Sequence, residues 1–139
     1  MRRITLSASL AAAATLGVFA LSAGPASAVT EPSMRTYGGG YYTNPLFDLT
    51  YTPPGRQCVN LTGTINGQNI NDAISSLMNG LPYYVFLYQD YDEHGKFVRF
   101  APGESLETLT QVPIYNADGS YFGVNTFDNR TSSICVDDL

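Results

Sequence analysis

Two segments of the chain repeat one pattern of oxygen-bearing side chains. Each has two adjacent Asn or Asp residues, two unrestricted positions and two serines, and the segments are Asn71-Asp72-Ala73-Ile74-Ser75-Ser76 (the first motif) and Asp128-Asn129-Arg130-Thr131-Ser132-Ser133 (the second motif). Such residues favour turns and caps, because their side chains bond to nearby backbone groups. Their oxygens are also suitable ligands for Ca²⁺, which takes roughly six to eight oxygens. One copy would indicate only a turn, whereas two copies favour a calcium site.

The expected affinity for calcium is low. Each motif contains a single carboxylate, Asp72 or Asp128, and the spacing of an EF-hand loop is absent. Few ligand charges predict dissociation constants of about 10⁻⁵ to 10⁻³ M, in the range of extracellular modules.

Few other residues could do catalytic or metal chemistry. His94 is the one histidine and lies in "DYDEHG" beside Asp90, Asp92 and Glu93, so an exposed acidic turn is expected there. A serine-nucleophile triad would need that histidine, and no Gly-x-Ser-x-Gly pattern occurs. Two cysteines and one histidine are too few for a structural zinc site. We therefore expect that the protein is not an enzyme.

Residues 1–28 have the features of a secretory signal peptide. Arg2 and Arg3 precede an apolar run from about Leu6 to Leu21, and small residues at Ala26 and Ala28 form a cleavage site. A membrane anchor is the alternative, but the run is short and a cleavage site follows it. The sequence predicts a secreted, extracellular protein that is cleaved after Ala28 and has no membrane span.

The remaining chain, 29–139, is acidic and has the length of one domain. Without Arg2 and Arg3 it has 7 − 2 = 5 basic and 12 acidic residues, a net charge of 5 − 12 = −7. No basic patch is available for phosphates, so nucleic acid is not an expected partner. In an exported chain, Cys58 and Cys135 are expected to form one disulfide, with two buried thiols as the alternative. We expect a monomer.

Short strands and frequent turns dominate this part of the chain. "YYVFLYQ" (83–89) and "KFVRF" (96–100) are rich in aromatic and β-branched residues and are expected to pair. "VPIY" and "YFGVN" flank a hairpin turn at "NADGS" (116–120). Residues 29–40 are expected to be a flexible lead-in to a domain covering 41–139, and the one helical candidate is near Asp72–Met78. The predicted fold is an all-β sandwich or barrel.

The chain also contains a weak internal repeat. "PGRQCVNL" (54–61) and "PGESLETL" (102–109) share Pro, Gly and the final Leu, and each is followed by one motif. Two copies of a unit that cannot bury its apolar face alone are expected to pack as halves of one core. The motif would then occur twice because the unit does.

These features resemble the microbial βγ-crystallins, whose calcium motif is Asn/Asp-Asn/Asp-x-x-Ser/Thr-Ser, twice per domain. Both segments match it at every specified position. A second signature, an aromatic residue followed seven positions later by glycine, fits Tyr88 and Gly95, whereas "YYTNPLFDLTY" in the first half has no glycine at the matching point. The resemblance implies a sandwich of two Greek keys with about eight strands and two calcium sites at one end.

The resemblance also implies which residues bind calcium. In the family, each site combines Asn or Asp oxygens and the third-position carbonyl of one motif with the fifth-position hydroxyl of the other. A carbonyl just after the first aromatic residue of the hairpin is added. Matched by position, these residues are Asn71, Asp72, Ala73, Ser75, Gln89, Asp128, Asn129, Arg130 and Ser132. Ser76 and Ser133 are expected to hold the turns, and no hairpin carbonyl is assigned in the first half.

Two functions remain open from the sequence. In one, the chain is a secreted module that calcium ions stabilise. In the other, the same scaffold binds a protein target, as killer-toxin-like proteins and peptidase inhibitors of similar architecture do. The expected contact segment is then "NADGSYFGVN" (116–125), and exposure of Tyr121 and Phe122 would favour this function.

Overall fold

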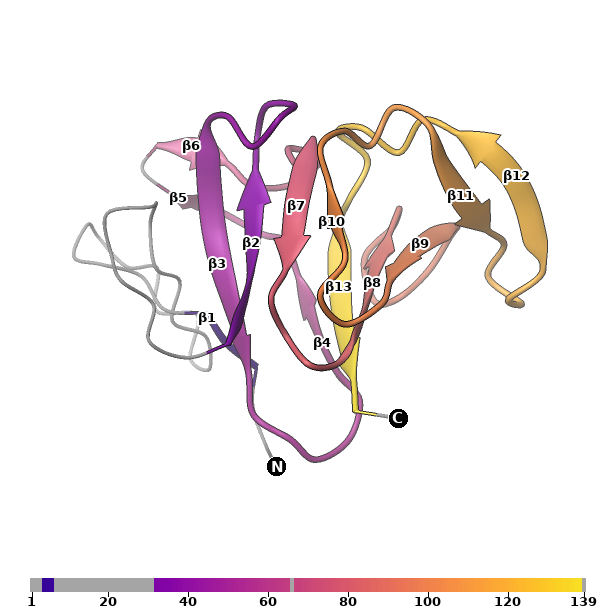
Figure 1. The fold of residues 1–139 in the computed structure, drawn as a ribbon, viewed down its shortest axis with the longest axis horizontal. Coiled ribbons are helices and arrows are strands. Elements are labelled where there is room, and N and C mark those ends of the chain that lie inside the picture. Colours follow the sequence, from indigo (N-terminus) through magenta and orange to yellow (C-terminus); the bar gives the residue numbers. More distant parts are fainter. Residues whose placement is uncertain (1–3, 7–31, 66, 139) are drawn as a thin grey trace.

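The computed structural model describes residues 4–6, 32–65 and 67–138, and these form two antiparallel sheets and a short hairpin (Figure 1). Sheet A contains, in spatial order, β1 (Ile4–Leu6), β3 (Pro45–Tyr51), β2 (Ser33–Tyr37), β7 (Ser76–Asn79) and β10 (Ser105–Leu106). Sheet B contains β12 (Tyr121–Asn125), β11 (Val112–Tyr115), β9 (Phe97–Phe100), β8 (Tyr84–Tyr88), β13 (Ser133–Asp137) and β4 (Gln57–Asn60). The hairpin contains β5 (Thr64–Ile65) and β6 (Gln68–Asn69).

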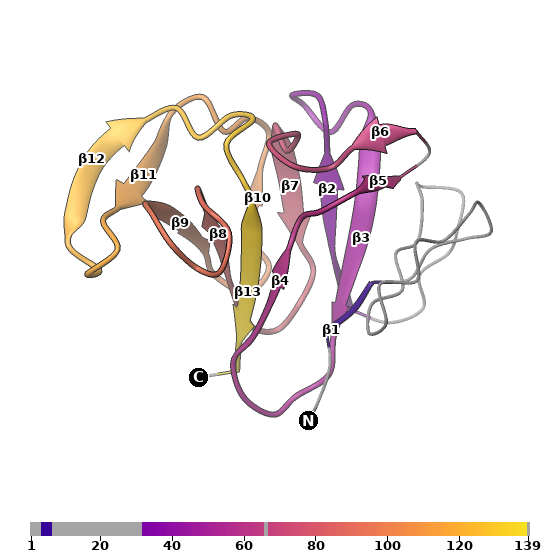
Figure 2. The ribbon, with the colours of Figure 1, turned by 180° about the vertical axis from the view of Figure 1, so that it is seen from behind.

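Each half of the chain exchanges one strand with the other half. The first half places β2, β3 and β7 in sheet A and β4 in sheet B, while the second half places β8, β9 and β13 in sheet B and β10 in sheet A. In the view from behind, β4 of the first half lies beside β13 of the second (Figure 2). The predicted sandwich of two Greek keys is therefore confirmed.

The strands beyond the two Greek keys lie in equivalent places. The hairpin β5–β6 is in the connection from β4 to β7, and the hairpin β11–β12 is in the matching connection from β10 to β13. The second hairpin is longer and extends sheet B through β9, so it projects from one side of the sandwich (Figure 1). The predicted turn at 116–120 joins β11 to β12, and the predicted pairing of 83–89 with 96–100 is that of β8 with β9.

Two local predictions are wrong. The segment Ser33–Tyr37, expected to be part of a flexible lead-in, is a strand between β3 and β7, so the domain does not begin at Tyr41. Its side chains are held by the core, since Met34 is fully buried and the Thr36 hydroxyl donates to the carbonyl of Phe47 over 2.7 Å. The region near Asp72–Met78 is a turn that leads into β7, without a helix.

The strand β1 lies inside the predicted signal peptide and pairs with β3, with Ile4 opposite Tyr51. Residues 1–3 and 7–31, which make up most of that peptide and the start of the lead-in, lie outside the described residues. Cleavage after Ala28 therefore remains a prediction. Within the described ranges no helix is long and apolar enough to cross a membrane.

One core fills the space between the sheets, and both halves contribute to it. It includes Leu77 from the first half and Leu87, Val98 and Ile134 from the second, each at most 1% exposed. Burial of such side chains stabilises the fold by about 1.5–3 kcal/mol each. The final leucines of the repeat, Leu61 and Leu109, are both fully buried, as expected for two halves that share one core.

The two cysteines join the halves covalently. Cys58 on β4 and Cys135 on β13 lie directly opposite each other and form a disulfide, with their Cα atoms 4.0 Å apart. The cysteines are 77 positions apart, and a crosslink over such a length stabilises a fold by about 4.5 kcal/mol in the chain-entropy account. The predicted disulfide is therefore present, and it links a strand of the first half to the last strand of the second.

Candidate metal centre

Each six-residue motif forms a tight turn before the last strand of its half. The second residue of each, Asp72 and Asn129, has φ = 53°, a left-handed conformation that Asn and Asp adopt more readily than other non-glycine residues. The two strands that follow, β7 and β13, both begin at the end of the sandwich that is uppermost in Figure 1. Both motifs therefore lie at one end of the molecule.

The backbones of the two motifs bond to each other. The N–H of Asp72 donates to the carbonyl of Thr131 over 2.9 Å, and the N–H of Asn129 donates to the carbonyl of Ile74 over 3.0 Å. The bonds join the second position of one motif to the fourth position of the other. The two turns are therefore related by a local pseudo-twofold symmetry, and neither completes its hydrogen bonding alone.

The side chains repeat this reciprocal contact. The Ser132 hydroxyl donates to Oδ1 of Asp72, and the Ser75 hydroxyl donates to Oδ1 of Asn129, both over 3.2 Å. Each fifth-position hydroxyl thus meets the second position of the other motif. This is the combination of residues that the family resemblance implies for a calcium site.

The sixth-position serines hold the hairpins that follow β2 and β8. The Ser76 hydroxyl donates to the carbonyl of Gly39 over 2.6 Å, and that of Ser133 donates to the carbonyl of Asp90 over 2.7 Å. The same oxygens accept the N–H groups of Tyr42 and Glu93, each over 3.2 Å. Both serines are fully buried, so their role in the turns is as the sequence predicts.

The hairpin of the first half is complete, which corrects the sequence analysis. It begins at Tyr37, and Asn44 stands seven positions later with φ = 57°, where Gly95 of the second half has φ = 77°. The positive φ values of Tyr41 and Tyr42 likewise match those of Asp92 and Glu93. The spacing from Tyr37 to Asn44 is the signal that the search for a glycine missed, because asparagine also tolerates this conformation.

The corrected hairpin identifies the position that the sequence analysis left unassigned. By position, Gly38 is the counterpart of Gln89, the residue just after the first aromatic. A methyl group added at Gly38 would lie 3.5 Å from the carbonyl oxygen of Ala73, the third position of the first motif. The hairpin backbone and the first motif therefore approach each other closely.

The residues present fit a hard cation. They offer carboxylate, amide, hydroxyl and backbone oxygens, which Ca²⁺ prefers. The Oδ1 atom of Asn71 is buried and has no hydrogen-bond partner among the described residues, and such a group needs a ligand or water to be satisfied. Arg130 is exposed, so its carbonyl can serve without its charged side chain approaching the site.

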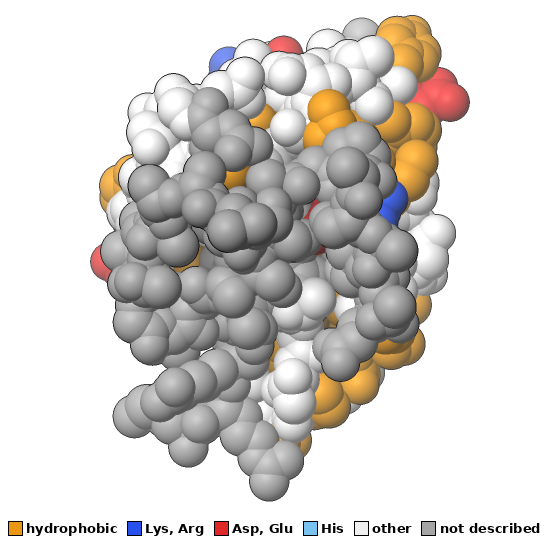
Figure 3. Space-filling view, turned by 90° about the vertical axis from the view of Figure 1, so that its left-hand side faces the viewer, with side chains coloured by type: hydrophobic (Ala, Val, Ile, Leu, Met, Phe, Trp, Pro, Cys, Tyr) orange, Lys and Arg blue, Asp and Glu red, His pale blue; other side chains and the backbone are white. Residues whose placement is uncertain are grey.

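Among the described residues, the other cluster of potential metal ligands does not form a competing site. The carboxylate of Glu93 lies with Cys58 and Cys135 within 4.8 Å, but the two sulfurs are bonded to each other and are not free as metal ligands. His94 is exposed, with Nδ1 2.7 Å from the carbonyl oxygen of Asp92, as expected for a residue in a polar turn. On the face seen from the side of β3, β5 and β6, the visible charged side chains of the described residues are scattered (Figure 3).

The strand arrangement matches that of a solved structure of a crystallin domain. That structure, described as "Evolution of the eye lens beta-gamma-crystallin domain fold", aligns with a TM-score of 0.56 and 17% sequence identity over 86% of this chain and 98% of that chain. No protein-family model and no curated protein matches the chain. The chain therefore has the βγ-crystallin fold.

Replacing Ser133 by alanine should lower the free energy of unfolding by about 1–3 kcal/mol, because the N–H of Glu93 loses its acceptor and the Asp90 carbonyl loses its donor. Denaturant titration measures the change. The matched control Ser105→Ala, at an exposed position, should stay within about 0.5 kcal/mol of wild type. Equal effects of the two substitutions would show that Ser133 does not hold the hairpin.

Proposed function

We propose that the chain is a secreted calcium-binding module of the βγ-crystallin type, in which calcium stabilises the fold. The observation that most supports this function is the reciprocal packing of the two motifs, in which Ser132 meets Asp72 and Ser75 meets Asn129. The polar turns of unrelated loops have no reason to pair in this way. Two hard cations, each bound by oxygens from both motifs, would account for it.

Two equivalent sites are proposed. The first would be held by Asn71, Asp72, the carbonyls of Ala73 and Gly38, and the hydroxyl of Ser132. The second would be held by Asp128, Asn129, the carbonyls of Arg130 and Gln89, and the hydroxyl of Ser75. Bound calcium would supply positive charge between the two halves, and the chain's own residues would hold the two turns together around it.

Calcium would act on stability by mass action. Each site needs both motifs in contact, so an unfolded chain offers no comparable site. A ligand that binds only the folded state stabilises it by about 2.7 kcal/mol at a hundred times its dissociation constant. Millimolar calcium outside a cell would reach that regime if the sites bind near the tight end of the predicted range, about 10⁻⁵ M.

Millimolar CaCl₂ should raise the midpoint of thermal unfolding relative to EGTA, and Asp72→Asn with Asp128→Asn should abolish most of the rise. Asparagine keeps the turn conformation and removes only a ligand charge. Asp118→Asn, on the exposed β11–β12 turn, is the matched control and should keep the full rise. If the midpoint of the wild-type protein is the same in CaCl₂ and in EGTA, the motifs are turns that do not bind calcium.

Export is part of the proposal and is supported by the predicted signal peptide. Cleavage after Ala28 would remove β1 and leave β3 as an edge of sheet A. Mass spectrometry of the exported chain should give Val29 as the first residue, and an exported chain that keeps residues 1–28 would contradict the proposal.

Protein binding is a second candidate, favoured by the exposure of the β11–β12 hairpin. Tyr121 and Phe122 are 61% and 47% exposed, and β12 is at the edge of sheet B. Such residues on a projecting hairpin are typical of a contact surface.

If the chain is a peptidase inhibitor, it should inhibit some member of a panel of secreted serine and metallopeptidases, and Tyr121→Ser with Phe122→Ser should remove that inhibition. Lack of inhibition across the panel would contradict the inhibitor function.

A further inference from the structure

A hollow of about 370 Å³ opens between β9 and β11, in the part of the molecule that the calcium proposal does not use. The two strands pair only where Tyr115 meets Phe97. Two residues further along this antiparallel ladder, Arg99 would face Pro113, which has no N–H to donate. The proline therefore explains why the strands separate and why the sheet has an opening here.

The hollow has an apolar floor and a polar rim. Val98, Phe100, Leu106 and Val112 form the floor, and all but Leu106 are at most 1% exposed. The rim has side chains that donate and side chains that accept hydrogen bonds, and they belong to Tyr84, Arg99, Glu104 and Gln111. A pocket that combines apolar walls with a few convergent polar groups is the usual form of a small-ligand site.

The polar groups at the rim are available to a ligand. Within the part of the chain that the structure describes, the side chains of Tyr84, Arg99 and Gln111 have no hydrogen bond or ion pair. Glu104 uses Oε2 to accept the N–H of Ala101 over 2.8 Å, which leaves its other carboxylate oxygen free. Donors and an acceptor thus surround the same opening.

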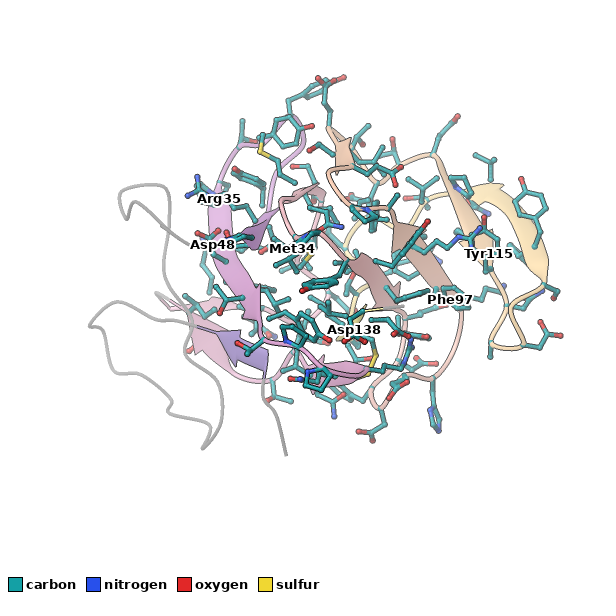
Figure 4. The ribbon with its side chains drawn as sticks, turned by 60° about the horizontal axis from the view of Figure 1, so that its bottom comes forward. Met34, Arg35, Asp48, Phe97, Tyr115 and Asp138 are labelled. Carbon is teal, nitrogen blue, oxygen red and sulfur yellow. A yellow bond between two sulfur atoms is a disulfide. The ribbon has the colours of Figure 1, made fainter. Side chains whose placement is uncertain are left out.

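Aromatic packing fixes the wall of the hollow. The rings of Phe97 and Tyr115 stack with centroids 5.5 Å apart and lie side by side on β9 and β11 (Figure 4). The guanidinium of Arg99 lies 4.9 Å from the centroid of Tyr115. A side chain that is held in place before binding loses less conformational entropy when a ligand arrives. The surface is therefore organised without a ligand.

We infer that this hollow binds a sugar ring of an oligosaccharide. Hydroxyl groups both donate and accept hydrogen bonds, which matches a rim with one cation, one carboxylate, one amide and one phenol. The apolar face of a sugar ring matches the floor and the Tyr84 ring. An anionic ligand would face Glu104 and a chain of net charge −5. A peptide strand inserted beside β11 would find no backbone N–H donor at Pro113. The volume of the hollow, about 370 Å³, is near the lower end of the roughly 300–1,000 Å³ that ligand pockets span.

Saturation-transfer NMR with millimolar cellobiose, maltose and N,N′-diacetylchitobiose tests this inference. At least one disaccharide should show transfer from the wild-type protein, in EGTA as well as in calcium. Arg99→Ala and Tyr84→Ala should each weaken binding roughly tenfold or more. Tyr41→Ala removes a tyrosine of the first hairpin that does not line the hollow and is 72% exposed, against 40% for Tyr84, and it should leave binding unchanged.

Pro113→Val is a second, independent variant. Valine restores the missing N–H, so β9 and β11 should pair further, close the hollow and abolish binding while the fold is kept. The inference is overturned if none of the three disaccharides shows transfer, or if binding survives Arg99→Ala combined with Tyr84→Ala. Unchanged binding by Pro113→Val would equally overturn it. Binding that requires calcium would also overturn it, because the ligand would then belong to the other end of the sandwich.

Discussion

The reciprocal bonding of the two six-residue motifs is the interaction on which the rest of the structure depends. The N–H groups of Asp72 and Asn129 each bond to the other motif, so each turn requires the other half of the chain. The exchange of β4 and β10 between the sheets brings the halves together in this register. Stability and the proposed calcium site therefore have the same origin, since whatever separates the halves removes both.

The two halves differ where symmetry is not needed. The motifs, the serines behind them and the two hairpins repeat almost bond for bond, whereas the connection from β10 to β13 is longer and forms β11 and β12. The exposed aromatic residues of β12 and the hollow beside Pro113 both belong to this added hairpin. The symmetric part is thus suited to holding the fold, and the added hairpin offers surfaces for recognition.

The sequence was sufficient for the features that depend on local pattern. The doubled motif and the repeat around 54–61 and 102–109 predicted two halves of one core, the family resemblance implied the two Greek keys, and the cysteine count predicted the disulfide. The strand Ser33–Tyr37 was missed because the adjacent glycines suggested a loose segment, while its burial depends on β3 and β7. The role of Asn44 was missed because only glycine was sought at a position that requires positive φ. The hollow depends on where the pairing of β9 and β11 ends, which no local pattern specifies.

The most direct test of the account is an NMR titration of the ¹⁵N-labelled protein with CaCl₂, following the backbone amides. The account predicts that the amides of both motifs and of both hairpins, including Asp72, Asn129, Gly38 and Gln89, shift together as calcium is added. The chemical shifts of the amides in the β11–β12 hairpin should not change. Amide shifts confined to one motif, or spread evenly over the amides of acidic residues at the surface, would contradict the claim that the two motifs form one reciprocal calcium-binding unit.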